Sequence, residues 1–321
     1  MKTLGGLYMQ KISGHHHISM LTKNGKKNND FYTKILGLRR VKKTVNQDSP
    51  SMYHLFYGDL TGAAGTELTF FEMPVAGRTV RGTNAITRIG LLVPSYDSLL
   101  YWKKRFELLQ VEHSDITTYA GKDALLFEDH EGLRMVLLNH NGQAIPAEWQ
   151  AWDGSDIASA HRILGMGTVE MTVRYLQRTV NLLQELFDYS VVTEDDIEVR
   201  LQSIAGETLG EIIVKELEGP SEKPGRGSIH HLALRVATVE ELQQWDAVIK
   251  AHGLDSTGVV DRYYFQSLYF RDRNGILFEM ATDGPGFTVD SAIEDLGREL
   301  DLPPFLEAQR TEIEAILEPL D

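Results

Sequence analysis

Three side chains of types that bind metal ions stand far apart along this chain. His17 and His231 each follow another histidine and lead into an apolar segment, and Glu279 lies within the apolar segment 276–280. Two imidazoles and one carboxylate that leave coordination positions open form the facial triad of non-haem Fe(II) oxygen chemistry. We therefore expect an enzyme that holds Fe(2+) through these three residues, provided that the fold brings the first and last quarters of the chain together.

The composition limits the other classes of function. The chain has 321 residues, of which 42% are hydrophobic and 24% are charged, as in ordinary globular proteins. A net charge of −14 argues against a nucleic-acid surface. No apolar run approaches the roughly 18 residues that would predict a membrane span. The absence of cysteine excludes disulfides and thiolate ligands, and it favours a cytoplasmic location. The sequence leaves both a monomer and a homo-oligomer open.

Internal repetition organises the chain. Four segments share one order of a strand, a helix and three further strands, and each predicts a βαβββ unit: 12–73, 85–140, 165–217 and 227–283. The helix of the first unit is predicted over 28–38, with Gly37 at its end. Each unit alone would leave an unpaired sheet edge and one exposed apolar face, so pairs of units are expected to form curved sheets around a concave interior.

The repeats divide the chain into larger parts, and the fold class is α+β. We expect a first domain of two units, a linker, a second domain of two units and a helical C-terminal extension, over 10–140, 141–164, 165–283 and 287–321. Pro303 and Pro304 precede a final amphipathic helix, which either packs on the outside or covers the site as a lid.

At this point the chain resembles the vicinal-oxygen-chelate superfamily, which includes glyoxalases, bleomycin-resistance proteins and extradiol ring-cleaving dioxygenases. The resemblance covers about 10–283 and rests on Asp30-Phe31-Tyr32 with Leu36-Gly37-Leu38, on the strand that follows His231, and on the four units in order. It implies two curved-sheet barrels. Aligning the units gives two sets of equivalent positions: His17, Arg88, Thr168 and His231 on the first strands, and Glu72, Val136, Glu216 and Glu279 on the last strands. Because units two and three offer no histidine, units one and four are expected to share the metal barrel.

Within that superfamily the chain is most similar to the hydroquinone-type ring-cleaving dioxygenases. The doubled histidines, Arg262 and Tyr269 match what that subfamily presents around its iron. The resemblance implies a hydroquinone-type diol and O2 as substrates, with catechols left open. It also implies that His230 or Tyr269 supplies a proton and that Arg262 anchors the distal hydroxyl. His16 and Ser19 would support the ligands or contact the substrate. Regular strand alternation, however, would turn His16 and His230 away from the site unless the strand bends there.

Two other readings stay open on the residues alone. Glu72 closes the first unit as Glu279 closes the fourth, so it is a rival carboxylate. With His17, His231 and Glu279 it would complete the four-ligand site of a glyoxalase-type isomerase or lyase. The second alternative is a metal-free protein that binds an aromatic compound without transforming it.

Overall fold

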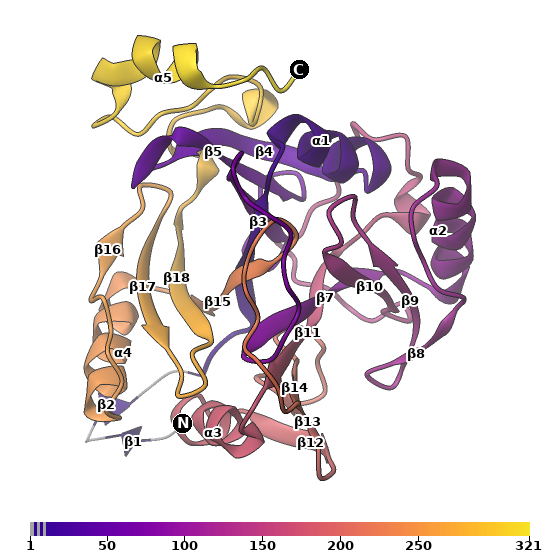
Figure 1. Cartoon of the computed structure of the whole chain (residues 1–321), viewed down its shortest axis with the longest axis vertical. Helices are drawn as coiled ribbons and strands as arrows, with labels where there is room; N and C mark the ends of the chain where they lie inside the picture. Colours follow the sequence, from indigo (N-terminus) through magenta and orange to yellow (C-terminus); the bar gives the residue numbers. More distant parts are fainter. Residues whose placement is uncertain (1–2, 5–6, 9–10) are drawn as a thin grey trace.

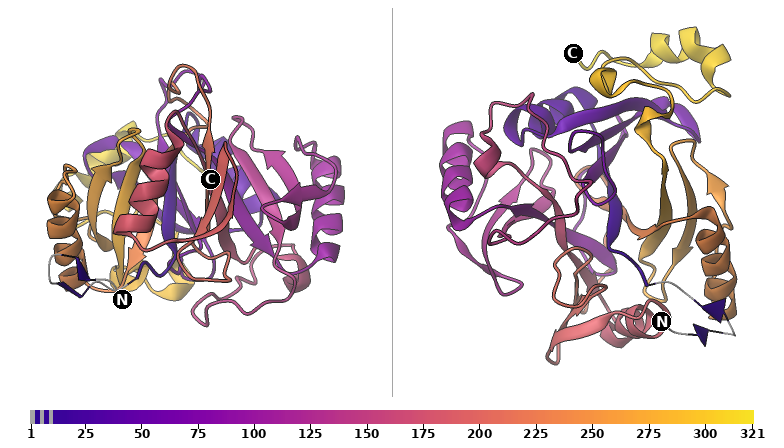
Figure 2. Two further views of the ribbon diagram at one scale, coloured as in Figure 1. Left: turned by 90° about the horizontal axis from the view of Figure 1, so that it is seen from below. Right: turned by 180° about the vertical axis from the view of Figure 1, so that it is seen from behind.

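Two eight-stranded sheets lie side by side and carry short helices on their outer faces (Figures 1 and 2). The computed structural model describes residues 3–4, 7–8 and 11–321. Within these residues no helix is long and apolar enough to cross a membrane. The architecture is α+β, as the repeats predict.

Each repeat folds as the predicted βαβββ unit. Unit one comprises β3 (His15–Thr22), α1 (Gly25–Asp30), β4 (Arg39–Asn46), β5 (Ser49–Gly58) and β6 (Glu67–Glu72). Unit two comprises β7 (Ala85–Val93), α2 (Tyr96–Leu109), β8 (Thr117–Tyr119), β9 (Lys122–Glu128) and β10 (Arg134–Asn139). Unit three comprises β11 (Gly165–Val173), α3 (Leu176–Asn181), β12 (Ser190–Glu194), β13 (Glu198–Gln202) and β14 (Ile212–Glu216). Unit four comprises β15 (Ile229–Val236), α4 (Val239–Ala251), β16 (Val260–Asp261), β17 (Phe265–Arg271) and β18 (Leu277–Pro285). A small β1 (Thr3–Leu4) and β2 (Leu7–Tyr8) pair precedes them.

The strand order decides which units share a sheet. The first sheet runs β16-β17-β18-β15-β3-β6-β5-β4 and the second runs β12-β13-β14-β11-β7-β10-β9-β8. Unit one therefore pairs with unit four, and unit two pairs with unit three, as expected. In each sheet the two first strands meet antiparallel, β3 against β15 and β7 against β11. Each first strand also pairs in parallel with the last strand of its own unit.

The helix of unit one begins earlier than the sequence predicts. It starts at Gly25 because the side chain of Asn24 accepts a hydrogen bond from the backbone N–H of Lys27 at 2.8 Å. Its second half, Phe31–Ile35, is a π-helical turn. Gly37 then takes a φ of +69°, a left-handed conformation that ends the helix at little steric cost.

The C-terminal extension lies over β4 and β5, and little of it is regular helix (Figure 1). After three short 3-10 turns its one α-helix is α5 (Arg310–Ile316). Lys42 of β4 is buried beneath the extension and bridges Asp290 at 2.7 Å and Asp301 at 2.6 Å. These two carboxylates compensate the cost of burying the ammonium group. The extension therefore packs on the outside of the first sheet, which is the first of the two arrangements that the sequence left open.

Candidate metal centre

The pairing of β3 with β15 contains two β-bulges, and both fall on the doubled histidines. On β15, Ile229 lies opposite Met20 while His231 lies opposite Ser19, so His230 is an extra residue. On β3 the same shift makes His16 the extra residue, between His17 and His15. A bulge interrupts the alternation of side chains and re-aims them. The strands are thus irregular at both places, which is the exception that the sequence left open, and His16 and His230 contact the neighbouring histidines instead of turning away.

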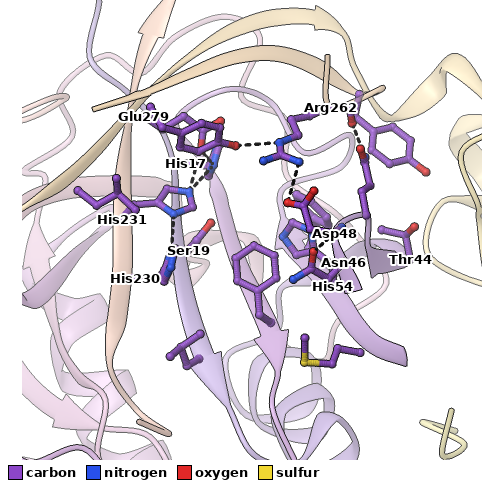
Figure 3. A pocket seen from close by; sticks show the side chains of 18 of the residues that line it. His17, Ser19, Thr44, Asn46, Asp48, His54, His230, His231, Arg262 and Glu279 are labelled. Atoms are coloured by element: carbon purple, nitrogen blue, oxygen red, sulfur yellow. Dashed lines mark hydrogen bonds and ion pairs between the residues drawn. The ribbon is translucent and has the colours of Figure 1, made fainter. Parts of the chain in front are cut away.

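The three residues of the expected triad converge at this place (Figure 3). The Nε2 atom of His17 lies 3.0 Å from Oε2 of Glu279, and the Nε2 atom of His231 lies 2.7 Å from the same oxygen. The two Nε2 atoms are 3.4 Å apart. All three side chains are buried. The fold thus brings together residues from strands β3, β15 and β18.

The spacing of these atoms fits a common metal ion. Ligand atoms about 2.1 Å from one ion and about 90° apart, as on one face of an octahedron, lie about 3.0 Å from one another. The observed separations of 2.7, 3.0 and 3.4 Å scatter around that value. Two imidazoles and one carboxylate also suit a divalent cation, so these three residues fit the Fe(2+) ion that the sequence predicts.

Hydrogen bonds fix the ring of His17 in the tautomer that leaves Nε2 free to bind a metal ion. Nε2 of His16 lies 3.0 Å from the carbonyl oxygen of Thr282, which can only accept, so this nitrogen carries the proton. Burial lowers the pKa of His16 to about 3, which keeps the ring neutral. Its Nδ1 is then an acceptor for the Nδ1–H of His17 at 3.0 Å. This arrangement leaves the lone pair of His17 Nε2 directed toward Glu279.

The second histidine pair repeats this arrangement. Nδ1 of His230 lies 2.8 Å from Nδ1 of His231. Burial lowers the pKa of His230, and the neighbouring His231 lowers it further, so the ring of His230 is neutral near pH 7. His230 also lines the cavity in front of the triad, unlike His16, which is enclosed. His230 therefore both contacts His231, a candidate metal ligand, and faces the cavity.

The carboxylate of Glu279 is held from behind by Ser267. The hydroxyl of Ser267 donates to Oε1 of Glu279 at 2.5 Å. Burial acts to raise the pKa of Glu279, but His17 and His231 outweigh it and hold the pKa well below its usual range. Ser267 was not among the residues predicted from the sequence. The signal was available, because it lies two residues before Tyr269 and so on the same side of the strand.

Tyr269 and Arg262 stand together at the edge of the triad. The Nε–H of Arg262 donates to the Tyr269 hydroxyl at 3.3 Å, and Arg262 Nη1 lies 3.1 Å from Oδ2 of Asp48. The Tyr269 ring centre is 5.8 Å from that of His231. Burial and the nearby Glu279 raise the pKa of Tyr269, so the phenol keeps its proton. Both residues line the cavity, as expected for groups that contact a substrate.

Glu72 does not join this cluster. Its Oε1 accepts the backbone N–H of Gly25 at 2.7 Å, at the start of α1. Ser19 and Ala233 are equivalent, because each lies two residues after the histidine of its first strand. Ser19 lies opposite Thr69 and Ala233 lies opposite Glu279, so the residue of unit one that is equivalent to Glu279 is Thr69. The alignment that made Glu72 a rival carboxylate is wrong by three residues. In unit three, the same comparison shows that Ile213, and not Glu216, is equivalent to Glu279.

Ser19 lies beside the triad and is linked through Thr69 to His54, which was not predicted as a site residue. The hydroxyls of Ser19 and Thr69 lie 2.7 Å apart, and Nε2 of His54 lies 3.2 Å from the Thr69 hydroxyl. His54 packs between Phe56 and Phe71, with ring centres 4.1 Å apart in both cases. Only the pairing of β5 with β6 brings His54 to the site, and no local pattern marks it.

A cavity of about 630 Å³ opens in front of the triad. Its wall combines the polar residues above with apolar side chains, namely Leu21, Met52, Phe56, Phe71, Met73, Phe265 and Leu277. Such a mainly apolar pocket with a few convergent polar groups is typical of a small-molecule site.

The second sheet has the same bulges without the histidines. Thr87 and Gly167 take the places of His16 and His230. In this sheet the buried Glu170 instead accepts a hydrogen bond from the Tyr119 hydroxyl at 2.7 Å and forms an ion pair with Lys215 at 2.8 Å. Among residues 11–321, the two groups of histidines and carboxylates close enough to hold a metal ion both lie in the first sheet, and both include His17.

Comparisons with known proteins agree with this architecture. Over 319 residues the chain is 46% identical to "Putative ring-cleaving dioxygenase MhqA" of Bacillus subtilis (strain 168), which covers 97% of this chain and 99% of the relative. It is 28% identical over 318 residues to a chlorohydroquinone/hydroquinone 1,2-dioxygenase of Sphingobium indicum, with 95% of both chains covered. A crystal structure of a "putative dioxygenase" from Bacillus subtilis superimposes with a TM-score of 0.90 at 33% identity, over 98% of this chain and 99% of that one.

A family model matches both halves of the chain, over residues 14–137 and 165–280. These segments include most of the four βαβββ units and all three residues of the triad. The chain belongs to the glyoxalase/bleomycin resistance protein/dioxygenase superfamily.

Proposed function

We propose that this protein is an Fe(2+)-dependent ring-cleaving dioxygenase of hydroquinone-type aromatic diols, which inserts O2 beside a hydroxyl-bearing carbon. The observation that carries the proposal is the convergence of His17, His231 and Glu279 within 3.4 Å at the wall of a largely apolar cavity. The names of the relatives support the same reaction, and one of them is a hydroquinone 1,2-dioxygenase.

The three triad residues line the cavity, so a metal ion that they hold would be within reach of a substrate there. When bound there, Fe(2+) would supply Lewis-acid binding of a phenolic oxygen and activation of O2. The rest of the work falls to the protein. His16 and His230 hold the ligand rings through their Nδ1 atoms, and Ser267 holds the carboxylate. Such supporting hydrogen bonds orient metal ligands and tune their basicity.

Proton transfer in the cavity would involve Tyr269 and His230. The protonated phenol of Tyr269 can donate a hydrogen bond to an oxygen bound beside His231. His230 faces the same cavity with a neutral ring, and because its Nδ1 accepts from His231, its proton lies on Nε2 and can be donated to a substrate oxygen. Arg262, fixed between Tyr269 and Asp48, would offer its remaining N–H groups to the distal hydroxyl or to an anionic product.

The structure weighs against the isomerase reading in one respect. A glyoxalase-type site would need a fourth protein ligand, and Glu72, the residue considered for it, is engaged at the start of α1. If the protein instead binds an aromatic compound without a metal ion, the triad should not be needed for that binding. The experiment described next tests this as well.

The experiment is O2 consumption by protein reconstituted anaerobically with Fe(II), with hydroquinone, methylhydroquinone and catechol tested in parallel. We expect O2 uptake matched by loss of the aromatic absorbance, and loss of both in His231→Ala. The control Glu72→Gln should keep them. Absence of uptake with every diol, in protein shown to hold one iron, would reject the proposal and favour an isomerase. Aromatic binding that persists unchanged in His17→Ala and His231→Ala, without uptake, would favour the binding protein.

A further inference from the structure

The cavity is much larger than a single diol ring requires. A cavity of about 150 Å³ is enough to hold benzene. The cavity in front of the triad has about 630 Å³. A hydroquinone ring bound next to His17 and His231 would therefore leave most of this space to other parts of a substrate.

The strand register shows where the spare space lies. His17, Ser19 and Leu21 follow one another on the same side of β3, and all three line the cavity. Leu21 lies opposite Phe71 on β6, and Phe71 lies opposite His54 on β5. At a rise of about 3.3 Å per residue, the row of Leu21 lies about 13 Å along the strand from that of His17. This distance exceeds the reach of a single ring that is bound at the metal.

The far part of the cavity is also chemically different. Next to the triad the lining is polar, with Ser19 and then His54. Farther along the strands the lining includes Leu21 and Phe71, which share the row of His54, then Met52, two residues before His54 on β5, and Met73, just after the end of β6. We call these four residues the apolar arm. Methionine side chains are flexible and polarizable, so they adapt to ligands of different shape.

Charge is absent from this arm. The charged residues that line the cavity are Glu279, Arg262 and Asp48. Glu279 belongs to the triad, and Arg262 and Asp48 pair with each other beside Tyr269. A charged substituent in the arm would lose its hydration without gaining a partner, whereas an apolar one would gain from burial.

We propose that the physiological substrates are hydroquinones with an apolar substituent larger than a methyl group, such as an alkyl chain of several carbons or an aryl ring, which lies in the apolar arm. The inference rests on the proposed function, because it places the diol end of the molecule at the triad. Burying one methylene group favours binding about fourfold. An arm that accepts a butyl group should therefore raise kcat/KM by about tenfold or more over methylhydroquinone.

The test compares hydroquinone, methylhydroquinone, butylhydroquinone and phenylhydroquinone by O2 uptake with the iron-loaded protein, and by calorimetric binding without O2. We expect kcat/KM and affinity to rise along the series. Met52→Trp, which fills the arm, should lower kcat/KM for butylhydroquinone at least tenfold and for methylhydroquinone by less than about threefold. Val75→Trp, at a side chain that is 93% exposed, is the control for adding an indole and should change neither.

Each other outcome has one meaning. Methylhydroquinone cleaved as well as butylhydroquinone or better, or equal losses for both diols in a folded Met52→Trp protein, would overturn the inference. If no diol is consumed, the ring-cleaving function is rejected, and the binding series then decides on the arm alone. Affinity that rises with the substituent and falls in Met52→Trp would support the arm, whereas affinity that does not depend on the substituent would overturn it.

Discussion

The Nε2 atoms of His17 and His231 lie 3.4 Å apart, although the two histidines are 214 positions apart along the chain. The contact exists because β3 and β15 pair antiparallel, with a bulge on each strand immediately before His17 and His231. The two bulges turn His16 and His230 toward the rings that they support. Residues next to each other in sequence thus form two matched pairs around one centre.

Removing the triad carboxylate should abolish metal binding, whereas removing the rival carboxylate should not. Glu279→Gln replaces an anionic ligand by a neutral amide at the centre, and we expect metal affinity to fall by at least about 100-fold. Glu72→Gln should retain one metal ion per chain and lose at most about 1 kcal/mol of stability at the start of α1. Metal content after dialysis, measured by mass spectrometry, checks both. Full occupancy in Glu279→Gln would contradict the assignment.

The Nδ1 atom of His16 should matter as a hydrogen-bond acceptor. His16→Asn can present its side-chain oxygen where Nδ1 stood, whereas His16→Leu cannot accept the proton of His17. We expect His16→Leu to lower metal affinity by about 10- to 100-fold and His16→Asn by clearly less. Competition with a chelator gives both affinities. Equal losses in the two variants would mean that the ring acts through packing alone.

Ser267 should position the carboxylate of Glu279. In Ser267→Ala the carboxylate loses the donor to Oε1, and we expect metal affinity to fall by about tenfold. Ser267→Thr keeps the hydroxyl and should lose less. The measurement is the same chelator competition, with thermal unfolding to show that both variants fold. An unchanged affinity in Ser267→Ala would show that the two imidazoles alone orient Glu279.

Replacing the candidate proton donors should affect turnover rather than metal binding. Tyr269→Phe keeps the ring beside His231 but removes the phenolic proton, and we expect kcat to fall about 100-fold with the iron content unchanged. His230→Asn, measured alongside, shows which of the two carries the proton, because the donor should cause the larger fall in kcat. Rates equal to those of the unmodified protein in both variants would remove both residues from the reaction.

Acid should destabilise the protein through His15, a buried histidine of β3 whose Nε2 lies 3.2 Å from the carbonyl oxygen of Glu211. Burial lowers its pKa to about 4 against an ordinary 6.5, despite hydrogen bonds to backbone carbonyls that act in the opposite direction. The unfolded chain therefore takes up this proton below pH 6.5, while the folded chain does so only near pH 4. The stability contribution is complete above pH 6.5 and is lost at about 1.4 kcal/mol per pH unit as pH falls toward 4.

The matched variant for this prediction is His15→Gln, which cannot titrate. Between pH 7 and pH 5 the unfolding free energy of the unmodified protein should fall by about 2 kcal/mol more than that of His15→Gln. Urea unfolding at the two pH values measures the difference. A difference between the two proteins that does not change with pH would show that His15 titrates normally in the folded state.

The sequence by itself determined the units and the chemistry that they carry. Strand and helix patterns depend on near neighbours, so four βαβββ units and their order could be predicted from the local alternation of apolar residues. The distribution of histidines among the units predicted that units one and four pair, and the sheet order confirms it. The types of His17, His231 and Glu279 indicated the kind of metal centre.

Only the tertiary structure decided the register, and with it the detailed site. Which residue of β6 stands level with Glu279 depends on hydrogen bonds between strands, so Thr69 rather than Glu72 takes that place. The bulges at His16 and His230 depend on the ladder between β3 and β15 in the same way. His54 reaches the cavity only because β5 pairs with β6. A shift of register leaves the local pattern of each strand unchanged, and contacts between distant segments of the chain therefore had to fix it.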